Sequence, residues 1–207
     1  MQSSLLVHDV VILRYSVPNF VWYRLYELPS PMTEQSIPCG DARGLFQTLL
    51  APSYETLPLS VRNVHHASHS ITLQGTCKVM RGRSRLSGLM AFFARLPPAG
   101  DKVPIKVTIR REEGREHWIR RFDKHEMAST LTAANGLLHE ALGPVRFLFR
   151  LHGSEQGIRW IPVGISAMGI PLPVGWFRFD VHERAEHDRY HFDVHVAIVG
   201  LGLLVHY

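Results

Sequence analysis

Glu116, Trp118, Arg120 and Phe122 are spaced two apart and could together bind a charged or polar group. Alternate residues of a β-strand share one face, so a strand here would place an acid, two aromatic rings and a guanidinium side by side. Such a face suits an arginine that binds a carboxylate or phosphate beside an aromatic floor. The alternative, and the commoner arrangement, is an exposed cross-strand salt bridge next to core aromatics.

Glu140 and Glu183 are carboxylates in segments that are otherwise apolar on one face. A carboxyl group in such surroundings can act as a general acid or base. The alternative is that each pairs with an arginine such as Arg81 or Arg150. The sequence contains no GxSxG elbow, P-loop or reactive-cysteine context, so it gives no indication of nucleophilic catalysis.

Two histidine-rich regions have spacings that could suit a metal site. His65 and His69 are four apart, a metal-ligand spacing on a helix, and His66 lies between them, but no acidic or cysteine ligand is near. The second region is interpreted as the polar half of an amphipathic hairpin; it comprises Asp180, His182, Glu183, His187, His191, Asp193 and His195. We therefore expect neither a metal nor a cofactor.

Short helices are predicted before residue 100. A helix that begins near Asp41 places Leu45, Phe46, Leu49 and Leu50 on one face and ends before Pro52. Residues 57–66 form a second short helical turn. Ser84 caps another helix, which Pro97 and Pro98 end.

Apolar and polar residues alternate over residues 71–79 and through most of the chain after residue 102. Turn residues separate the alternating segments, as at Asn135-Gly136, so successive strands are expected to pair antiparallel. The predicted fold class is α+β and β-dominated: a curved antiparallel sheet or partly open barrel of about seven to eight strands, with two to three short helices. The sheet is expected to wrap around the helix at 84–96.

Residues 1–31 differ from the rest, with aromatic residues in no clear period, followed by Pro29-Ser30-Pro31 and a second methionine, Met32. We interpret them as a non-native or loosely attached extension; the alternative is a real strand pair that covers a hydrophobic face. Residues 32–207 are then a single domain.

Composition favours a cytoplasmic protein. The chain has 207 residues, 45% of them hydrophobic, and only two cysteines, so a disulfide framework is not expected. No apolar run reaches the roughly 20 residues of a membrane-spanning helix. The net charge is +5, but the basic residues are scattered, so no nucleic-acid partner is expected.

A series of spaced fragments runs through residues 41–207. They are Val61-Arg62 with His65, Val79-x-Arg81-Gly82, Leu96-Pro97-Pro98-Ala99-Gly100, Glu116-x-Trp118-x-Arg120-x-Phe122, Glu140 with Gly143-Pro144, Phe147-x-Phe149-x-Leu151, Gly157 with Trp160, Gly169-x-Pro171-Leu172-Pro173, Phe192-Asp193-Val194, and Gly200-x-Gly202-Leu203-Leu204-Val205-x-Tyr207. In this order and spacing they resemble the bacterial DUF4166 domain family, whose function is unassigned. Similar domains are joined to nucleotide-binding oxidoreductase domains, so the resemblance implies an oxidoreductase as a partner.

These observations lead us to expect a non-enzymatic binding or accessory domain that holds a small apolar or amphipathic ligand in the concave sheet. Phe147, Phe149, Phe177, Phe179 and Phe192 would line or support the pocket. The candidate ligand-binding residues are His65, Arg81, Trp118, Arg120, Glu140, Trp160 and Glu183. The alternatives are a cofactor-independent acid–base enzyme that uses His65 or Glu140, and an interaction domain that docks on an oxidoreductase.

Overall fold

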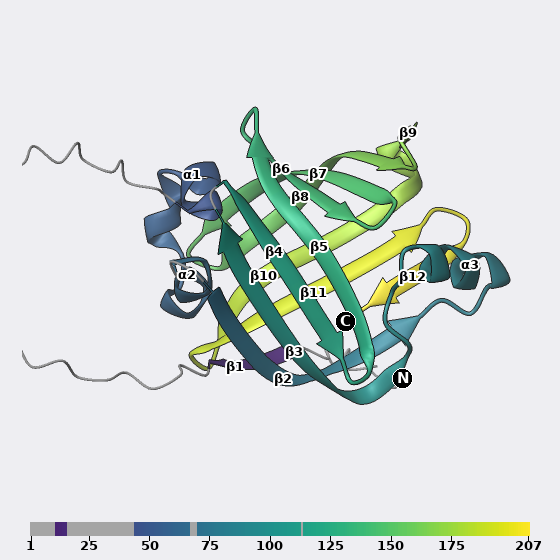
Figure 1. Ribbon diagram of the computed structural model, residues 1–207, viewed down its shortest axis with the longest axis horizontal. Coiled ribbons are helices and arrows are strands. Elements are labelled where there is room, and N and C mark those ends of the chain that lie inside the picture. The colour runs from purple at the N-terminus through teal and green to yellow at the C-terminus, as the bar shows by residue number, and fades with distance from the viewer. Residues whose placement is uncertain (1–10, 16–43, 67–69, 113) are drawn as a thin grey trace, which may run out of the picture.

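The alternating segments form long antiparallel strands in a computed structural model, which describes residues 11–15, 44–66, 70–112 and 114–207 (Figure 1). Inward-facing residues alternate with outward-facing ones, as in β4, whose Glu116, Trp118, Arg120 and Phe122 are all buried. The strands are β1 Val11–Tyr15, β2 Ser70–Arg81, β3 Gly100–Glu112, β4 Arg115–Phe122, β5 His125–Ala134, β6 Leu137–Leu142, β7 Val145–Ser154, β8 Gly157–Ala167, β9 Ile170–Leu172, β10 Phe177–Glu186, β11 Arg189–Ile198 and β12 Gly202–His206.

These strands form a 12-stranded sheet that closes into a barrel. From β2 to β8 each strand pairs with the next, then β8 pairs with β10 and β10 with β11, while the short β9 pairs only with β8. Two short strands fill the seam between β11 and β2. β12 pairs with both in one half of the seam, and β1 pairs with both in the other half.

The prediction of a β-dominated antiparallel fold with short helices is confirmed, but the expected strand number and the partly open barrel are wrong. One cause lies in residues 190–205, which continue the alternating pattern but form two strands rather than one. Gly200 and Gly202 both have a positive φ, which glycine adopts at little cost, and the chain reverses there into β11 and β12. The resulting β12 then pairs with β2 and closes the barrel.

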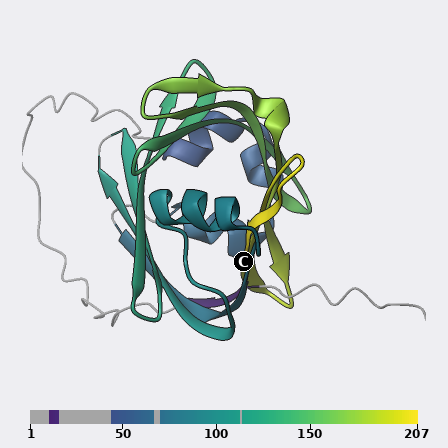
Figure 2. The same cartoon turned by 90° about the vertical axis from the view of Figure 1, so that its right-hand side faces the viewer.

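The helices cover the two ends of the barrel (Figures 1 and 2). At one end lie α1 Leu45–Leu50, the 3-10 helix η1 Ser53–Thr56 and α2 Leu59–His66, which we call the helical plug. At the other end α3 Arg85–Phe93 lies across the opening, so the sheet does not wrap around it as expected. Ser84 caps α3 as predicted, because its Oγ accepts a hydrogen bond from the Ser87 backbone N–H at 3.0 Å. A further 3-10 helix, η2 Val174–Trp176, precedes β10.

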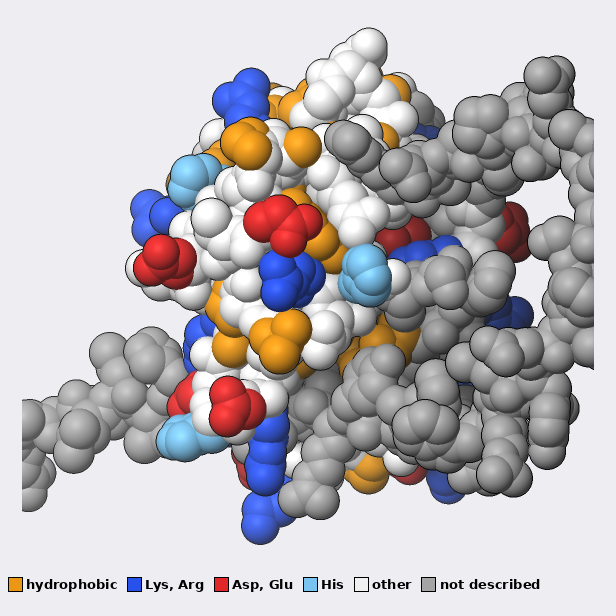
Figure 3. Space-filling model, turned by 90° about the vertical axis from the view of Figure 1, so that its left-hand side faces the viewer, with side chains coloured by type: hydrophobic (Ala, Val, Ile, Leu, Met, Phe, Trp, Pro, Cys, Tyr) orange, Lys and Arg blue, Asp and Glu red, His pale blue; other side chains and the backbone are white. Residues whose placement is uncertain are grey.

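The helical plug contributes part of the hydrophobic core. Phe46, Leu50 and Val61 are at most 2% exposed and lie in one cluster with the inward residues of the strands. Gly153 of β7 allows this close approach, since a Cβ there would meet Ser53 Oγ at 2.9 Å and Leu50 at 3.3 Å. Figure 3 views this end of the molecule, where acidic and basic side chains are interspersed.

Deletion of residues 1–31 is expected to leave a folded barrel. The deletion removes β1, which pairs with Leu73–Thr76 of β2 and Tyr190–Phe192 of β11, but β12 still joins the same two strands in the other half of the seam. The melting temperature of the chain that begins at Met32 should fall by less than about 10 °C, which corresponds to a few kcal/mol. A larger loss in a thermal melt would show that β1 is an integral part of the barrel.

Candidate ligand-binding site

A cavity of about 310 Å³ lies inside the barrel beneath α3. Met90, Phe93 and Leu96 line it from α3 and the segment after it, and inward side chains of the strands form the remaining walls. Among the described residues, only Arg120 and Glu140 bring charge to this lining. The other strand residues in contact with the cavity include Met127, Leu142, Phe147, Phe149, Trp160, Ile165, Phe177, Phe179, Phe192, Val194, Val196 and Tyr207.

Arg120 and Glu140 form a buried ion pair at this cavity. The Nη2 of Arg120 lies 3.3 Å from Glu140 Oε1, and the two side chains are 4% and 11% exposed. Arg120 Nη1 also donates to Ser129 Oγ at 2.9 Å, and the guanidinium carbon lies 4.9 Å from the centre of the Trp118 ring. The Nε of Arg120 is buried and makes no hydrogen bond within the described part of the chain, so one N–H donor is unused.

Aromatic rings form one wall of the cavity. Phe149 lies 5.8 Å from Phe147 and 5.4 Å from Trp160, measured between ring centres, and Phe179 lies 5.7 Å from Phe147. Edge-to-face and offset contacts of this kind hold rings in fixed orientations. The wall is therefore a preformed apolar surface.

Tyr207 places a neutral phenol at the cavity. Burial raises the pKa of Tyr207 to about 12, with Glu140 also raising it and Arg120 opposing the change. The hydroxyl is therefore protonated at physiological pH and can donate or accept a hydrogen bond.

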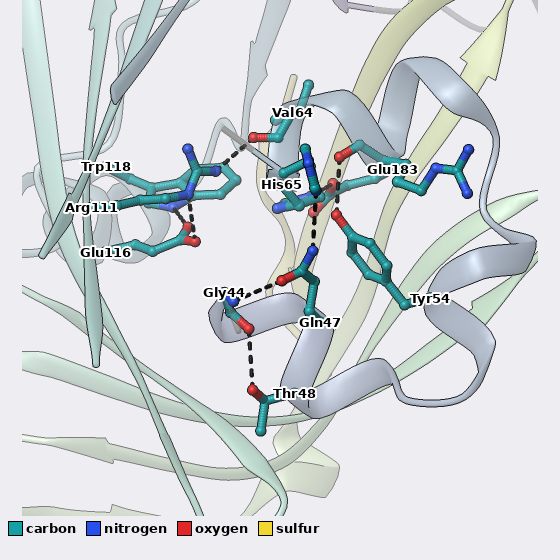
Figure 4. Close-up of polar contacts among 12 residues, drawn as sticks. Gly44, Gln47, Thr48, Tyr54, Val64, His65, Arg111, Glu116, Trp118 and Glu183 are labelled. Carbon is teal, nitrogen blue, oxygen red and sulfur yellow. Dashed lines mark hydrogen bonds and ion pairs between the residues drawn. The ribbon is translucent and has the colours of Figure 1, made fainter. Parts of the chain in front are cut away.

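A second polar cluster lies beneath the helical plug (Figure 4). His65 of α2 and Glu183 of β10 have fully buried side chains, and His65 Nε2 lies 2.5 Å from Glu183 Oε2. The other oxygen of Glu183 accepts a hydrogen bond from the Trp160 indole at 2.9 Å. The His65 ring stacks on Phe46, with 3.7 Å between ring centres. These contacts attach α2 to the barrel wall.

Glu116 is the centre of a third cluster of the same design (Figure 4). It accepts a hydrogen bond from the Trp118 indole at 2.8 Å and one from Arg111 Nε at 3.1 Å. Arg111 Nη2 also donates to the backbone oxygen of Val64 in α2 at 2.6 Å. In the second and third clusters, the buried carboxylate thus accepts a hydrogen bond from a tryptophan indole and pairs with a basic side chain. Both clusters are attached to the last turn of α2.

The seven predicted ligand-binding residues therefore occupy three places. Arg120, Glu140 and Trp160 line the cavity. Trp118, His65 and Glu183 lie in the polar clusters beneath the plug, outside the cavity lining. Arg81 lies near α3, where its Nη1 donates to the backbone oxygens of Leu96 and Pro97.

Two interpretations of these polar residues are wrong. The four residues of β4 face inward and are at most 3% exposed, so they do not form an exposed salt bridge. The suggested partners Arg81 and Arg150 are also wrong, because Glu140 pairs with Arg120 and Glu183 with His65.

Arg111 and Tyr207 were missed in the sequence. Val107, Ile109 and Arg111 are spaced two apart, so alternation places Arg111 on the same strand face as two apolar residues. This position was the available signal. Tyr207 follows the last strand, and its place at the end of the fragment Gly200-x-Gly202-Leu203-Leu204-Val205-x-Tyr207 was the available signal.

His65 and His66 contact different partners and do not converge on one site. His65 faces Glu183, while His66 is exposed and its Nδ1 lies 3.1 Å from the Gln47 side-chain nitrogen; His69 lies outside the described residues. In the hairpin, Asp180 and His182 pair on the exposed face as predicted, whereas Glu183 and His191 are buried. Within the described ranges, no group of three or more histidine, cysteine or acidic side chains could hold a metal ion.

Fold and cavity together define a closed antiparallel β-barrel with an apolar interior cavity, which among the described residues is lined by one ion pair, Arg120 and Glu140. Residues 57–207 match the family model described as "Domain of unknown function (DUF4166)", so the chain belongs to this family. Searches of curated proteins and of solved structures each gave no match. None of the helices in the described part of the chain is both long and apolar enough to span a membrane.

Proposed function

We propose that this barrel is a non-enzymatic binding domain that holds one small apolar or amphipathic molecule in the cavity beneath α3. The observation that carries the proposal is a cavity of about 310 Å³ with a mostly apolar and aromatic lining. Small-molecule sites typically begin at about 300 Å³ and combine such a lining with a few placed polar groups. Arg120, Glu140 and Tyr207 are those groups here.

The charges at the cavity favour an uncharged polar group on the ligand. Arg120 and Glu140 neutralise each other, so a carboxylate on the ligand would bring an uncompensated charge into an apolar interior. A hydroxyl or carbonyl oxygen carries no such cost and can accept a hydrogen bond from the unused N–H of Arg120 or from Tyr207. We therefore propose an alcohol or ketone with an apolar body as the ligand class.

Fluorescence titration with N-phenyl-1-naphthylamine, an uncharged apolar probe, tests the proposal. The protein should bind the probe, and decanol should displace it at least about tenfold better than decanoate, because burying the carboxylate costs more than about 1.4 kcal/mol. No binding of the probe would contradict the proposed function. Equal displacement by the two competitors would contradict the proposed ligand class.

Two tryptophan variants show whether the probe occupies the cavity. Val196 lines the cavity from β11 and is 8% exposed, so Val196→Trp should fill part of the space and lower probe affinity at least about tenfold. Ile161 lies on β8 and is 39% exposed, so Ile161→Trp is the matched control and should not change affinity. Equal affinities in the two variants would place the probe elsewhere.

The alternatives have weaker support. An acid–base enzyme would need its catalytic group beside the bound molecule, but His65 does not line the cavity, and Glu140 is paired with Arg120. No feature of the described surface favours an oxidoreductase as the docking partner, so that partner remains a prediction.

A further inference from the structure

Helix α3 presents most of its large apolar side chains outward. The residues that it buries are the small Ser87 and Ala91, whereas Leu86, Leu89, Phe92 and Phe93 are between 47% and 77% exposed. A surface helix ordinarily turns its large apolar residues towards the core. This reversed arrangement leaves an apolar face on the outside of the barrel.

Neighbouring turns extend this face. Met168 in the turn between β8 and β9 is 80% exposed, Trp176 of η2 is 57% exposed, and Val199 in the turn between β11 and β12 is 54% exposed. Figure 2 shows that α3 and these segments all lie at the same end of the barrel. We call this surface the apolar rim, defined by Leu86, Leu89, Phe92, Phe93, Met168, Ile170, Trp176 and Val199.

Unpaired basic side chains flank α3. Arg83, Arg85 and Arg95 are exposed, and within the described chain none forms an ion pair with a carboxylate. The sequence contains no acidic residue between Glu55 and Asp101, and Asp101 lies 3.9 Å from Lys78. The chain segment that carries α3 is therefore apolar and positively charged.

We propose that the apolar rim docks on the surface of an anionic lipid bilayer. A short helix with exposed leucine and phenylalanine beside arginine, and with a tryptophan at the edge, has the side chains that partition into the headgroup region. The rim is made of projecting tips from separate segments, which can enter a deformable lipid surface together. Unpaired arginines provide the charge complementarity with anionic headgroups.

Docking at this end would also bring the cavity to the bilayer. Phe93 lines the cavity and is 61% exposed, so it belongs to both surfaces. An apolar ligand could then pass between lipid and cavity without crossing water. This last step rests on the proposed function, whereas docking itself does not.

Vesicle co-sedimentation of the full chain tests the docking. Binding to phosphatidylcholine vesicles that contain about 30% phosphatidylglycerol should be at least about tenfold stronger than to phosphatidylcholine alone, since each exposed arginine is attracted to the anionic headgroups. The difference should shrink in about 0.5 M salt, where charge interactions are screened within a few Å. Absence of binding to both vesicle types would overturn the proposal.

Phe92→Ser and Leu59→Ser are the matched variants. Phe92 is 77% exposed on the rim, whereas Leu59 is 63% exposed in α2 at the opposite end, and neither lines the cavity. Phe92→Ser should weaken vesicle binding about tenfold, because it removes an aromatic ring that inserts into the lipid, and Leu59→Ser should have no effect. Equal vesicle binding by the two variants would overturn the proposal.

Two further measurements separate the competing explanations. Both variants should bind N-phenyl-1-naphthylamine as the wild type does in the absence of vesicles, so a failure of docking is distinguishable from a failure of the cavity. Sedimentation velocity without lipid should show the same mass for the wild type and Phe92→Ser. Self-association that Phe92→Ser abolishes, without any loss of vesicle binding, would assign the rim to a second copy of the chain and overturn the lipid proposal.

Discussion

Replacing Glu183 by leucine is expected to lower the free energy of unfolding by about 3 to 5 kcal/mol. Glu183 is 1% exposed, pairs with His65 at 2.5 Å and accepts the Trp160 indole hydrogen bond at 2.9 Å. The leucine leaves the imidazole and the indole N–H buried without a partner, and each such group costs about 1 to 3 kcal/mol. Urea denaturation of the wild type and the variant measures the difference.

Glu112→Leu is the matched control for this change. Glu112 also pairs with a histidine, His117 at 3.4 Å, but the two side chains are 63% and 33% exposed. Water solvates both groups after the substitution, so the loss should stay within about 0.5 kcal/mol. A similar loss in free energy of unfolding in both variants would show that burial does not make the Glu183 pair more important for stability than the exposed pair.

The double variant His65→Leu/Glu183→Leu tests the mechanism of the loss. It removes both members of the pair, so it should be more stable than the sum of the two single losses predicts. Amide hydrogen exchange should accelerate first in α1 and α2, because His65 attaches α2 to β10. Strict additivity of the two losses would contradict a direct interaction.

Much of the fold could be predicted from the sequence because each strand buries one face. Alternation located most strands, and Ser84 marked the start of α3. Closure could not be predicted in this way. It depends on β12 pairing with β2, which is a contact between residues more than a hundred positions apart that no local pattern encodes.

The site was predictable to a similar degree. Spacing placed Trp118, Arg120 and Phe122 on one strand face, but alternation alone cannot say whether that face points inward. In the closed barrel this face of β4 points inward, as the burial of its side chains shows. The sequence alone leaves the partner of Arg120 open, and only the three-dimensional arrangement assigns Glu140 to it.

The substitution Arg120→Leu is expected to cost about 3 kcal/mol or more in stability, because it leaves the buried Glu140 carboxylate without its cation. It also removes the hydrogen bond to Ser129 and the contact with the Trp118 ring. Arg121 on the opposite face of β4 is the control. Its salt bridge to Glu126 at 2.7 Å is exposed, so Arg121→Leu should cost less than about 0.5 kcal/mol.

The same pair of variants tests the cavity as a binding site. Arg120→Leu leaves Glu140 as the single charge in the lining, so decanol should bind more weakly because it loses the Arg120 N–H donor, and decanoate should bind more weakly still because the unpaired carboxylate repels it, while Arg121→Leu should bind like the wild type. If Arg120→Leu is too unstable to assay, Arg120→Leu/Glu140→Leu restores neutrality with apolar side chains and should recover stability while still binding decanol more weakly than the wild type. Small and equal effects of Arg120→Leu and Arg121→Leu on both stability and binding would mean that Arg120 is not a polar anchor inside the barrel, and the proposed ligand class would fall with it.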